Sequence, residues 1–73
     1  MTVIMSQGET IGTRLRRARR LAGFTQDELS EASRVDRATI SRIEQGHIQE
    51  PYISTLRKFA AALNLEVRDL IDE

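Results

Sequence analysis

The sequence contains no cysteine, one proline and four glycines among its 73 residues. Without cysteine, neither disulfide bonds nor thiolate metal ligands can support the core, and a chain of this length buries only about 60% of its unfolded surface. Few prolines and glycines leave regular elements uninterrupted, and 40% of the residues are apolar. The composition therefore favours a single domain of packed helices, and the lack of cysteine is compatible with a cytoplasmic location.

Long apolar runs are also missing, since no stretch approaches the roughly 18 apolar residues of a membrane span. The first ten residues, MTVIMSQGET, contain no lysine or arginine, so we expect no signal peptide. We expect a flexible tail at residues 1–9 and one domain at residues 10–73. His47 is the only histidine, and no catalytic triad or phosphate-binding glycine loop is visible. We therefore expect no metal, no cofactor and no enzymatic activity.

The formal net charge is zero, but the charges are unevenly distributed along the chain. Residues 1–42 carry eight arginines and five acids, a balance of +3, whereas residues 43–73 carry three basic residues and six acids, a balance of −3. Arginine suits bidentate contact with phosphate or guanine. The distribution indicates one face directed towards a polyanion, although a random division of charges in a small domain is the alternative.

The first predicted helix covers about residues 10–22. Apolar residues recur along it at helical spacing: Ile11, Leu15, Ala18 and Ala22. The opposite side is expected to be a solvated face and carries Arg16, Arg17 and Arg20. Arg19 lies at the edge of the apolar stripe, and a half-buried arginine requires an acidic partner.

Two independent signals start a second helix just after Gly23. Thr25 and Glu28 have the spacing of a capping box, in which each side chain bonds the backbone N–H of the other. Phe24 and Leu29 occupy the positions of a hydrophobic staple. The boundary at this point is therefore strongly predicted.

A third helix follows after a short turn and repeats these signals. Asp36 is the predicted N-cap, Val35 and Ile40 form a second staple, and Gly46 ends the helix. With the two isoleucines of this helix placed inward, its outward residues are Ala38, Ser41, Arg42 and Gln45, with Arg37 at the N-terminal flank. Glu44 falls at the edge of the buried side, where Arg19 can meet it.

Two more helices are predicted near residues 53–63 and 67–71. The core stripe of the first consists of Ile53, Leu56, Phe59, Ala60 and Leu63. Asn64 is a plausible left-handed stop, because asparagine tolerates positive φ. The last helix is expected to pack Val67, Leu70 and Ile71.

Two short capped helices joined by a short turn resemble a helix-turn-helix. The stretch FTQDELSEASRVDRATISRIEQG resembles the phage Cro/repressor-type family, also called XRE-like, and the resemblance extends over residues 10–71. The combination of TQ in the second helix with TISRIEQG in the third makes it specific. It implies an all-α fold, a compact five-helix bundle with a helix-turn-helix, as in lambda-repressor-like DNA-binding domains.

The resemblance also implies roles for particular residues, with the third helix in the DNA major groove. Base contacts are expected from Arg37, Ala38, Ser41 and Arg42, and phosphate contacts from Arg19, Gln26 and Gln45. Arg19 and Glu44 match the family's structural ion pair, which ties the first helix to the third.

The chemistry of these side chains is consistent with such roles. Arg37 and Arg42 can each donate two hydrogen bonds to guanine, a contact worth about 1–3 kcal/mol of discrimination. Alternatives stay open: Arg37 could hold a phosphate, Ala38 could be only a helix former, and Gln26 could be an ordinary surface residue.

Three positions depart from the family pattern. Ser30 replaces a small alanine, and a buried serine there would need a backbone acceptor. Arg34 replaces the glycine of the turn, so a left-handed conformation would cost roughly 1–2 kcal/mol. Asp36 replaces a capping serine and adds a negative charge near the DNA.

These observations predict a sequence-specific DNA-binding transcriptional regulator, a repressor or controller protein. We expect it to bind a palindromic operator in double-stranded DNA as a homodimer, because one small domain makes few contacts. The alternative is an antitoxin or adaptor module of the same fold whose main partner is a protein. No membrane partner is expected.

Overall fold

The computed structural model describes residues 9–71, which form five helices and no strand. The helices are α1 (Ile11–Leu21), α2 (Gln26–Ser33), α3 (Arg37–Glu44), α4 (Ile53–Leu63) and α5 (Arg68–Ile71). The predicted all-α fold is confirmed. No helix in this range is long and apolar enough to cross a membrane. The tail predicted at residues 1–9 lies outside the described residues except for Glu9.

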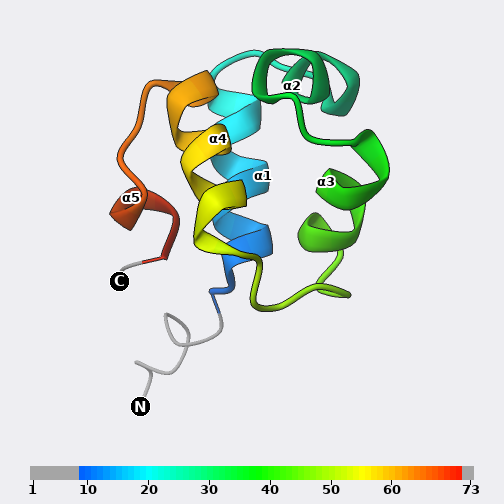
Figure 1. Cartoon of the computed structure of the whole chain (residues 1–73), viewed down its shortest axis with the longest axis vertical. Coiled ribbons are helices and arrows are strands. Elements are labelled where there is room, and N and C mark those ends of the chain that lie inside the picture. Colours follow the sequence, from blue (N-terminus) through cyan, green and yellow to red (C-terminus); the bar gives the residue numbers. More distant parts are fainter. Residues whose placement is uncertain (1–8, 72–73) are drawn as a thin grey trace.

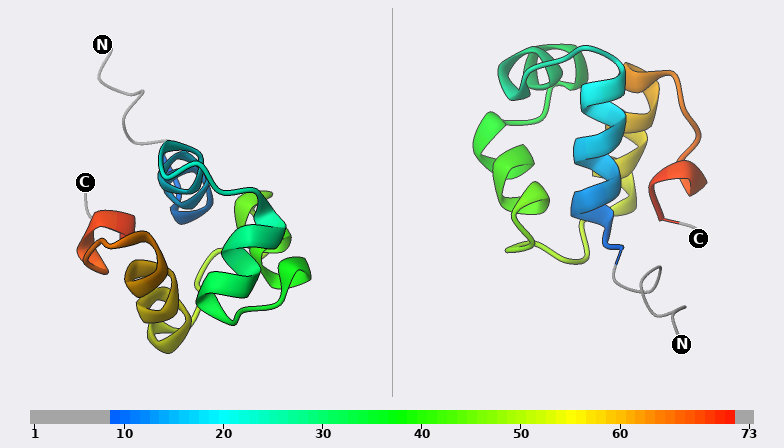
Figure 2. Two further views of the ribbon diagram at one scale, coloured as in Figure 1. Left: turned by 90° about the horizontal axis from the view of Figure 1, so that it is seen from above. Right: turned by 180° about the vertical axis from the view of Figure 1, so that it is seen from behind.

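The helices surround α1, which lies near the centre of Figure 1. In that view α3 lies on one side, α5 on the other, and α2 across one end; the view from behind in Figure 2 shows the same order. α1 packs against α3 and α5, while α2 packs against α3 and α4. α3 is therefore held to the rest of the domain through α1 and α2.

Local sequence signals explain where α1 and α2 meet. Gly23 ends α1 with a positive φ of 81°, which glycine adopts without a steric penalty. At the start of α2, Thr25 Oγ1 accepts from the Glu28 N–H at 3.0 Å, and Glu28 Oε1 accepts from the Thr25 N–H at 2.9 Å. The predicted capping box is thus confirmed, and two of the otherwise unsatisfied N–H groups of α2 are paired.

Asp36 stands at the predicted N-cap position of α3, but its side chain makes no capping hydrogen bond. An N-cap carboxylate normally accepts from the N–H two or three residues later. Here the N–H of Thr39 donates instead to the backbone carbonyl of Asp36 at 3.0 Å. The helix start was therefore predicted correctly, whereas the capping role of the Asp36 carboxylate was wrong.

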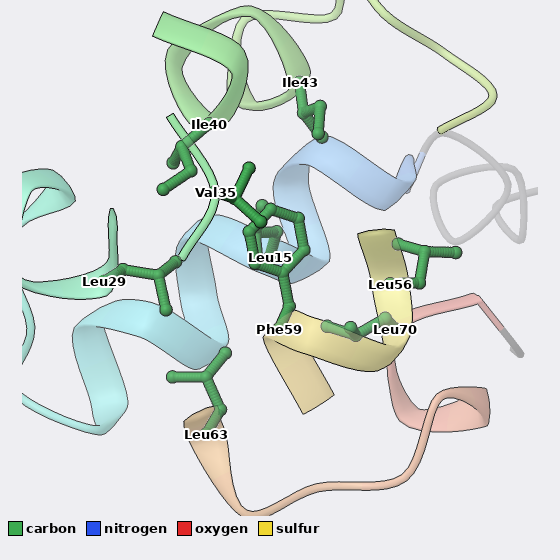
Figure 3. Close-up of a cluster of buried hydrophobic side chains, with 9 residues drawn as sticks. All are labelled: Leu15, Leu29, Val35, Ile40, Ile43, Leu56, Phe59, Leu63 and Leu70. Carbon is green, nitrogen blue, oxygen red and sulfur yellow. The ribbon is translucent and has the colours of Figure 1, made fainter. Parts of the chain in front are cut away.

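The core lies between α1, α2, α3 and α4 and is completed by one residue of α5 (Figure 3). Its buried cluster consists of Leu15, Leu29, Val35, Ile40, Ile43, Leu56, Phe59, Leu63 and Leu70. Three residues predicted to be inward are instead exposed: Ala22, Ile53 and Ile71. Each lies at or just beyond the end of its helix, where no neighbouring helix covers the apolar stripe.

Gly12 allows α1 and α3 to approach each other closely. A Cβ atom built at Gly12 would lie 2.1 Å from the backbone oxygen of Ile43, far inside van der Waals contact. Any side chain at this position would push α3 away from α1. Glycine is unfavourable inside a helix by about 1 kcal/mol relative to alanine, so its presence in α1 has a packing reason.

Candidate nucleic-acid interface

The inner side of α3 is tied to α1 by a buried ion pair. Arg19 Nε donates to Glu44 Oε2 at 2.7 Å, and Arg19 Nη2 donates to Glu44 Oε1 at 3.0 Å. Arg19 Nη1 also donates to the carbonyl of Phe24 at 2.8 Å. Arg19 is 8% exposed and Glu44 6%, so the acidic partner predicted for Arg19 is present. The arrangement uses three of the five N–H groups of Arg19.

Glu44 gathers two further side chains besides Arg19. Gln26 Nε2 donates to Glu44 Oε1 at 3.1 Å. Arg16 Nη2 donates to the Glu44 carbonyl at 3.1 Å, and its Nε lies 3.6 Å from Glu44 Oε1. Arg16, which was predicted to lie on a solvated face, is partly exposed and also contacts α3, because the packing of α1 against α3 brings the end of α3 within its reach. One carboxylate thus connects α3 with both α1 and α2.

The protonation of Glu44 follows from these contacts. Burial raises the pKa of its carboxyl. The hydrogen bonds from Arg19 and Gln26, together with the charges of Arg19 and Arg16, lower this pKa by a larger amount. The net pKa lies below its ordinary value of 4.5. The hydrogen bond to Glu44 raises the pKa of Arg19. Both groups are therefore charged at neutral pH.

The residues predicted to contact DNA lie together on the opposite side of α3. We call this surface the outer face of α3: Arg37, Ala38, Ser41, Arg42 and Gln45. All are exposed except Ser41, which is half-buried and whose Oγ accepts from Gln45 Nε2 at 3.1 Å. Within residues 9–71, the guanidinium of Arg42 makes no hydrogen bond or ion pair. Arg42 is exposed, so its donors are accessible to a ligand.

Gln26 and Arg37 bring the first residues of α2 and α3 together. Arg37 Nη1 donates to Gln26 Oε1 at 3.5 Å, and Arg37 Nε lies 3.0 Å from Asp27 Oδ1. Asp27 was not among the residues predicted to lie at this surface. A sequence signal for this contact is lacking, because the two residues are ten positions apart and meet only through the angle between the two helices.

The departures from the family pattern at Arg34 and Ser30 have different structural outcomes. Arg34 is left-handed, with φ 65°, so the strained turn expected from the sequence is present. Ser30 is half-buried, and the buried serine of α2 is Ser33, three residues later. Ser33 Oγ accepts from the Val35 N–H at 3.3 Å.

This arrangement presents an exposed helix face with two arginines, of which Arg37 lies next to the N-terminus of α2. A helix N-terminus favours anions, because its first N–H groups are unsatisfied and the helix dipole is positive there. Guanidinium groups on an exposed helix can donate in pairs to guanine or to phosphate. Among the described residues, no group of three or more His, Asp or Glu is placed to hold a metal ion. The chemistry of the surface therefore suits a nucleic acid.

Two short helices joined by a tight turn, with the second helix exposed along one side, define the helix-turn-helix class. The Helix-turn-helix family model matches residues 15–70, and the chain belongs to this family. The resemblance inferred from its residues is thus confirmed.

The HTH-type transcriptional regulator SinR of Bacillus subtilis (strain 168) is 35% identical to the chain over 63 residues. This match covers 86% of the present chain and 57% of SinR. The chain therefore spans little more than half the length of this relative.

Solved structures show the same relationship. One is the crystal structure of SinR, described as the master regulator for biofilm formation, in complex with DNA. It has a TM-score of 0.84 and 33% identity, and the match covers 86% of this chain and all of that chain. A SinR–SinI protein complex has a TM-score of 0.84 and 34% identity, and the match covers 88% of this chain and 62% of that chain. The restriction-modification controller protein C.AhdI from Aeromonas hydrophila has a TM-score of 0.79 and 33% identity, and the match covers 84% of this chain and 91% of that chain.

Proposed function

We propose that this protein is a sequence-specific DNA-binding transcriptional regulator. The observation that carries the proposal is the outer face of α3, where Arg42 is exposed and has no partner among residues 9–71, while the other side of the helix is anchored by Glu44. A buried inner side and an exposed cationic outer side suit a helix that enters the major groove. The similarity to SinR, solved in complex with DNA, supports this function.

The proposed contacts follow from the positions of the side chains. The base edges would be contacted by Arg37, Ala38, Ser41 and Arg42. The phosphates would be contacted by Gln26, by Gln45 and by the two N–H groups of Arg19 that Glu44 and Phe24 leave available. Because one domain makes few contacts, we propose a homodimer that binds two half-sites about 34 Å apart, one helical turn of DNA. Its location would be the cytoplasm, and we infer no enzymatic activity.

A second candidate is an adaptor or antitoxin module whose main partner is a protein. The SinR–SinI complex favours this possibility. The two functions differ in their dependence on salt. Binding through phosphates weakens steeply as salt rises, with the logarithm of affinity linear in the logarithm of salt concentration. A module that binds only proteins would show no such behaviour with duplex DNA.

Selection of bound duplexes from a random DNA pool, followed by a salt series on the selected duplex, tests the proposal. R42A is expected to lose about 1–3 kcal/mol on that duplex and to lose its preference at one base pair. R57A removes an exposed arginine from α4 and serves as the matched control, with little change in base preference. Failure to select any sequence, or equal loss by R42A on every sequence, would contradict base recognition by α3.

A further inference from the structure

Asp27 and Arg37 form an ion pair directly beside the outer face of α3. The Arg37 Nε atom lies 3.0 Å from Asp27 Oδ1, and the side chains are 59% and 82% exposed. Arg37 Nη1 donates to Gln26 Oε1 at 3.5 Å, a longer contact. Two residues at the start of α2 therefore contact the first side chain of α3.

The shape of the guanidinium group makes this contact informative. Arginine can donate in pairs along two edges: Nε together with one Nη, or both Nη atoms together. The Asp27 carboxylate lies against the Nε side of the guanidinium as an ion pair, without an aligned hydrogen bond. The edge formed by the two Nη atoms is therefore the less obstructed one for the O6 and N7 acceptors of guanine. The Gln26 contact on Nη1 is at the limit of hydrogen-bond length and is readily exchanged for a stronger acceptor.

We propose that Asp27 is a positioning residue for base recognition. Its carboxylate holds the Arg37 guanidinium so that the Nη edge meets a guanine and does not turn to the nearest phosphate. The inference rests on the proposed DNA-binding function and deepens it by naming a residue that restricts sequence preference without contacting DNA. It also assigns Arg37 to a base, where the sequence alone left a phosphate contact open.

The same carboxylate has an opposite effect on overall affinity. Asp27 lies in the first turn of α2, close to where a phosphate would approach the helix N-terminus. A negative charge at this position repels the DNA backbone of every sequence. Asp27 therefore lowers affinity for DNA in general while it increases discrimination at one base pair.

Removal of this carboxylate is expected to leave the fold intact. An ion pair between two exposed side chains contributes little to stability. The start of α2 is capped by Thr25 and Glu28, which make their hydrogen bonds independently of Asp27. D27N and D27S are thus both expected to fold, which circular dichroism and thermal unfolding would establish before DNA binding is measured.

The experiment uses the full chain and a duplex that the wild-type protein has selected from a random DNA pool. Affinity is measured on this duplex and on each of its single base-pair variants. R37A identifies the base pair at which Arg37 discriminates, with a preference of about 5- to 150-fold in the wild type. D27N is expected to reduce that preference by about two- to fivefold, which is the range for an exposed ion pair, to leave the other positions unchanged, and to raise affinity for unrelated duplexes.

D36N is the matched control, because it removes an exposed carboxylate from the start of α3 that makes no capping hydrogen bond. It is expected to raise affinity by the same factor on every sequence. The proposal is overturned if D27N behaves like D36N, or if R37A weakens all sequences equally. Both results leave DNA binding itself standing. A wild-type chain that selects no duplex would instead refute the proposed function, and the inference with it.

Discussion

Replacement of Glu44 by alanine should strongly destabilise the domain. Arg19 would remain buried, at 8% exposure, without the carboxylate that now accepts two of its hydrogen bonds. Breaking a buried pair by removing one partner costs about 3–5 kcal/mol. A domain of this size has a total stability of only about 4–11 kcal/mol. E44A therefore removes a large part of the free energy of unfolding.

Thermal and urea unfolding followed by circular dichroism provide the measurement. For a domain of this length each kcal/mol shifts Tm by about 4–8 °C, so we expect a decrease of roughly 12–40 °C. E31A is the matched control, because Glu31 is exposed on α2 and its removal should change stability by at most about 0.5 kcal/mol.

A double-mutant cycle separates the ion pair from general packing. The double variant R19M/E44L replaces both charges with apolar groups, and such replacements of buried pairs are often neutral or stabilising. The single variants of the cycle are R19M and E44L, and the double variant is thus expected to be more stable than E44L. A loss of less than about 1 kcal/mol in E44A would refute the argument, and so would two single losses that simply add in the double variant.

The pH dependence of unfolding tests the same contact. The pKa of Glu44 in the folded protein lies below its ordinary value of 4.5, so the folded state binds this proton less tightly than the unfolded state. Its contribution is complete above the unfolded pKa and is lost as pH falls through the lower folded value. E44Q should lack this part of the acid-induced loss. An identical acid profile for E44Q and wild type would contradict the assignment.

Three further predictions concern backbone and cap positions. G12A should lower the free energy of unfolding by about 1–3 kcal/mol, because the added methyl group meets the α3 backbone; a neutral result in thermal unfolding would contradict the close approach. R34G should raise stability by about 0.5–1 kcal/mol by relieving the left-handed turn, and N64G, at the other left-handed non-glycine position described, should gain less, because asparagine tolerates that conformation. T25A should lower the free energy of unfolding by about 1 kcal/mol, whereas D36A should lower it by less than half as much, because of these two residues only Thr25 makes a capping hydrogen bond. Equal losses in urea unfolding would contradict this difference.

Helix boundaries were the most predictable part of the fold, because capping depends on residues close together in the sequence. Thr25 and Glu28 signal the start of α2, and Gly23 the end of α1, without reference to any other helix. The exposed ends of the apolar stripes were less predictable. Periodicity indicates which side of a helix is apolar, but not how far a neighbouring helix extends, and for this reason Ile53 was wrongly assigned to the core.

The site was predictable to the extent that one helix determines it. The side of α3 that carries Arg42 could be assigned from periodicity, and the burial of Arg19 at the edge of a stripe implied an acid partner. The contacts of Asp27 and Arg16 depend on how helices cross in space, which no local spacing encodes. Gly12 is an intermediate case: a glycine inside a helix implies a packing reason, but does not identify the helix that approaches it.

The separation of the two sides of α3 has a consequence for how such a protein can change its target. α3 is held to the domain by the buried side chains of Ile40, Ile43 and Glu44. Side chains on the other side can therefore be exchanged with little effect on folding. Redesign of target preference, by natural variation or in the laboratory, can proceed through the outer positions while the scaffold remains the same.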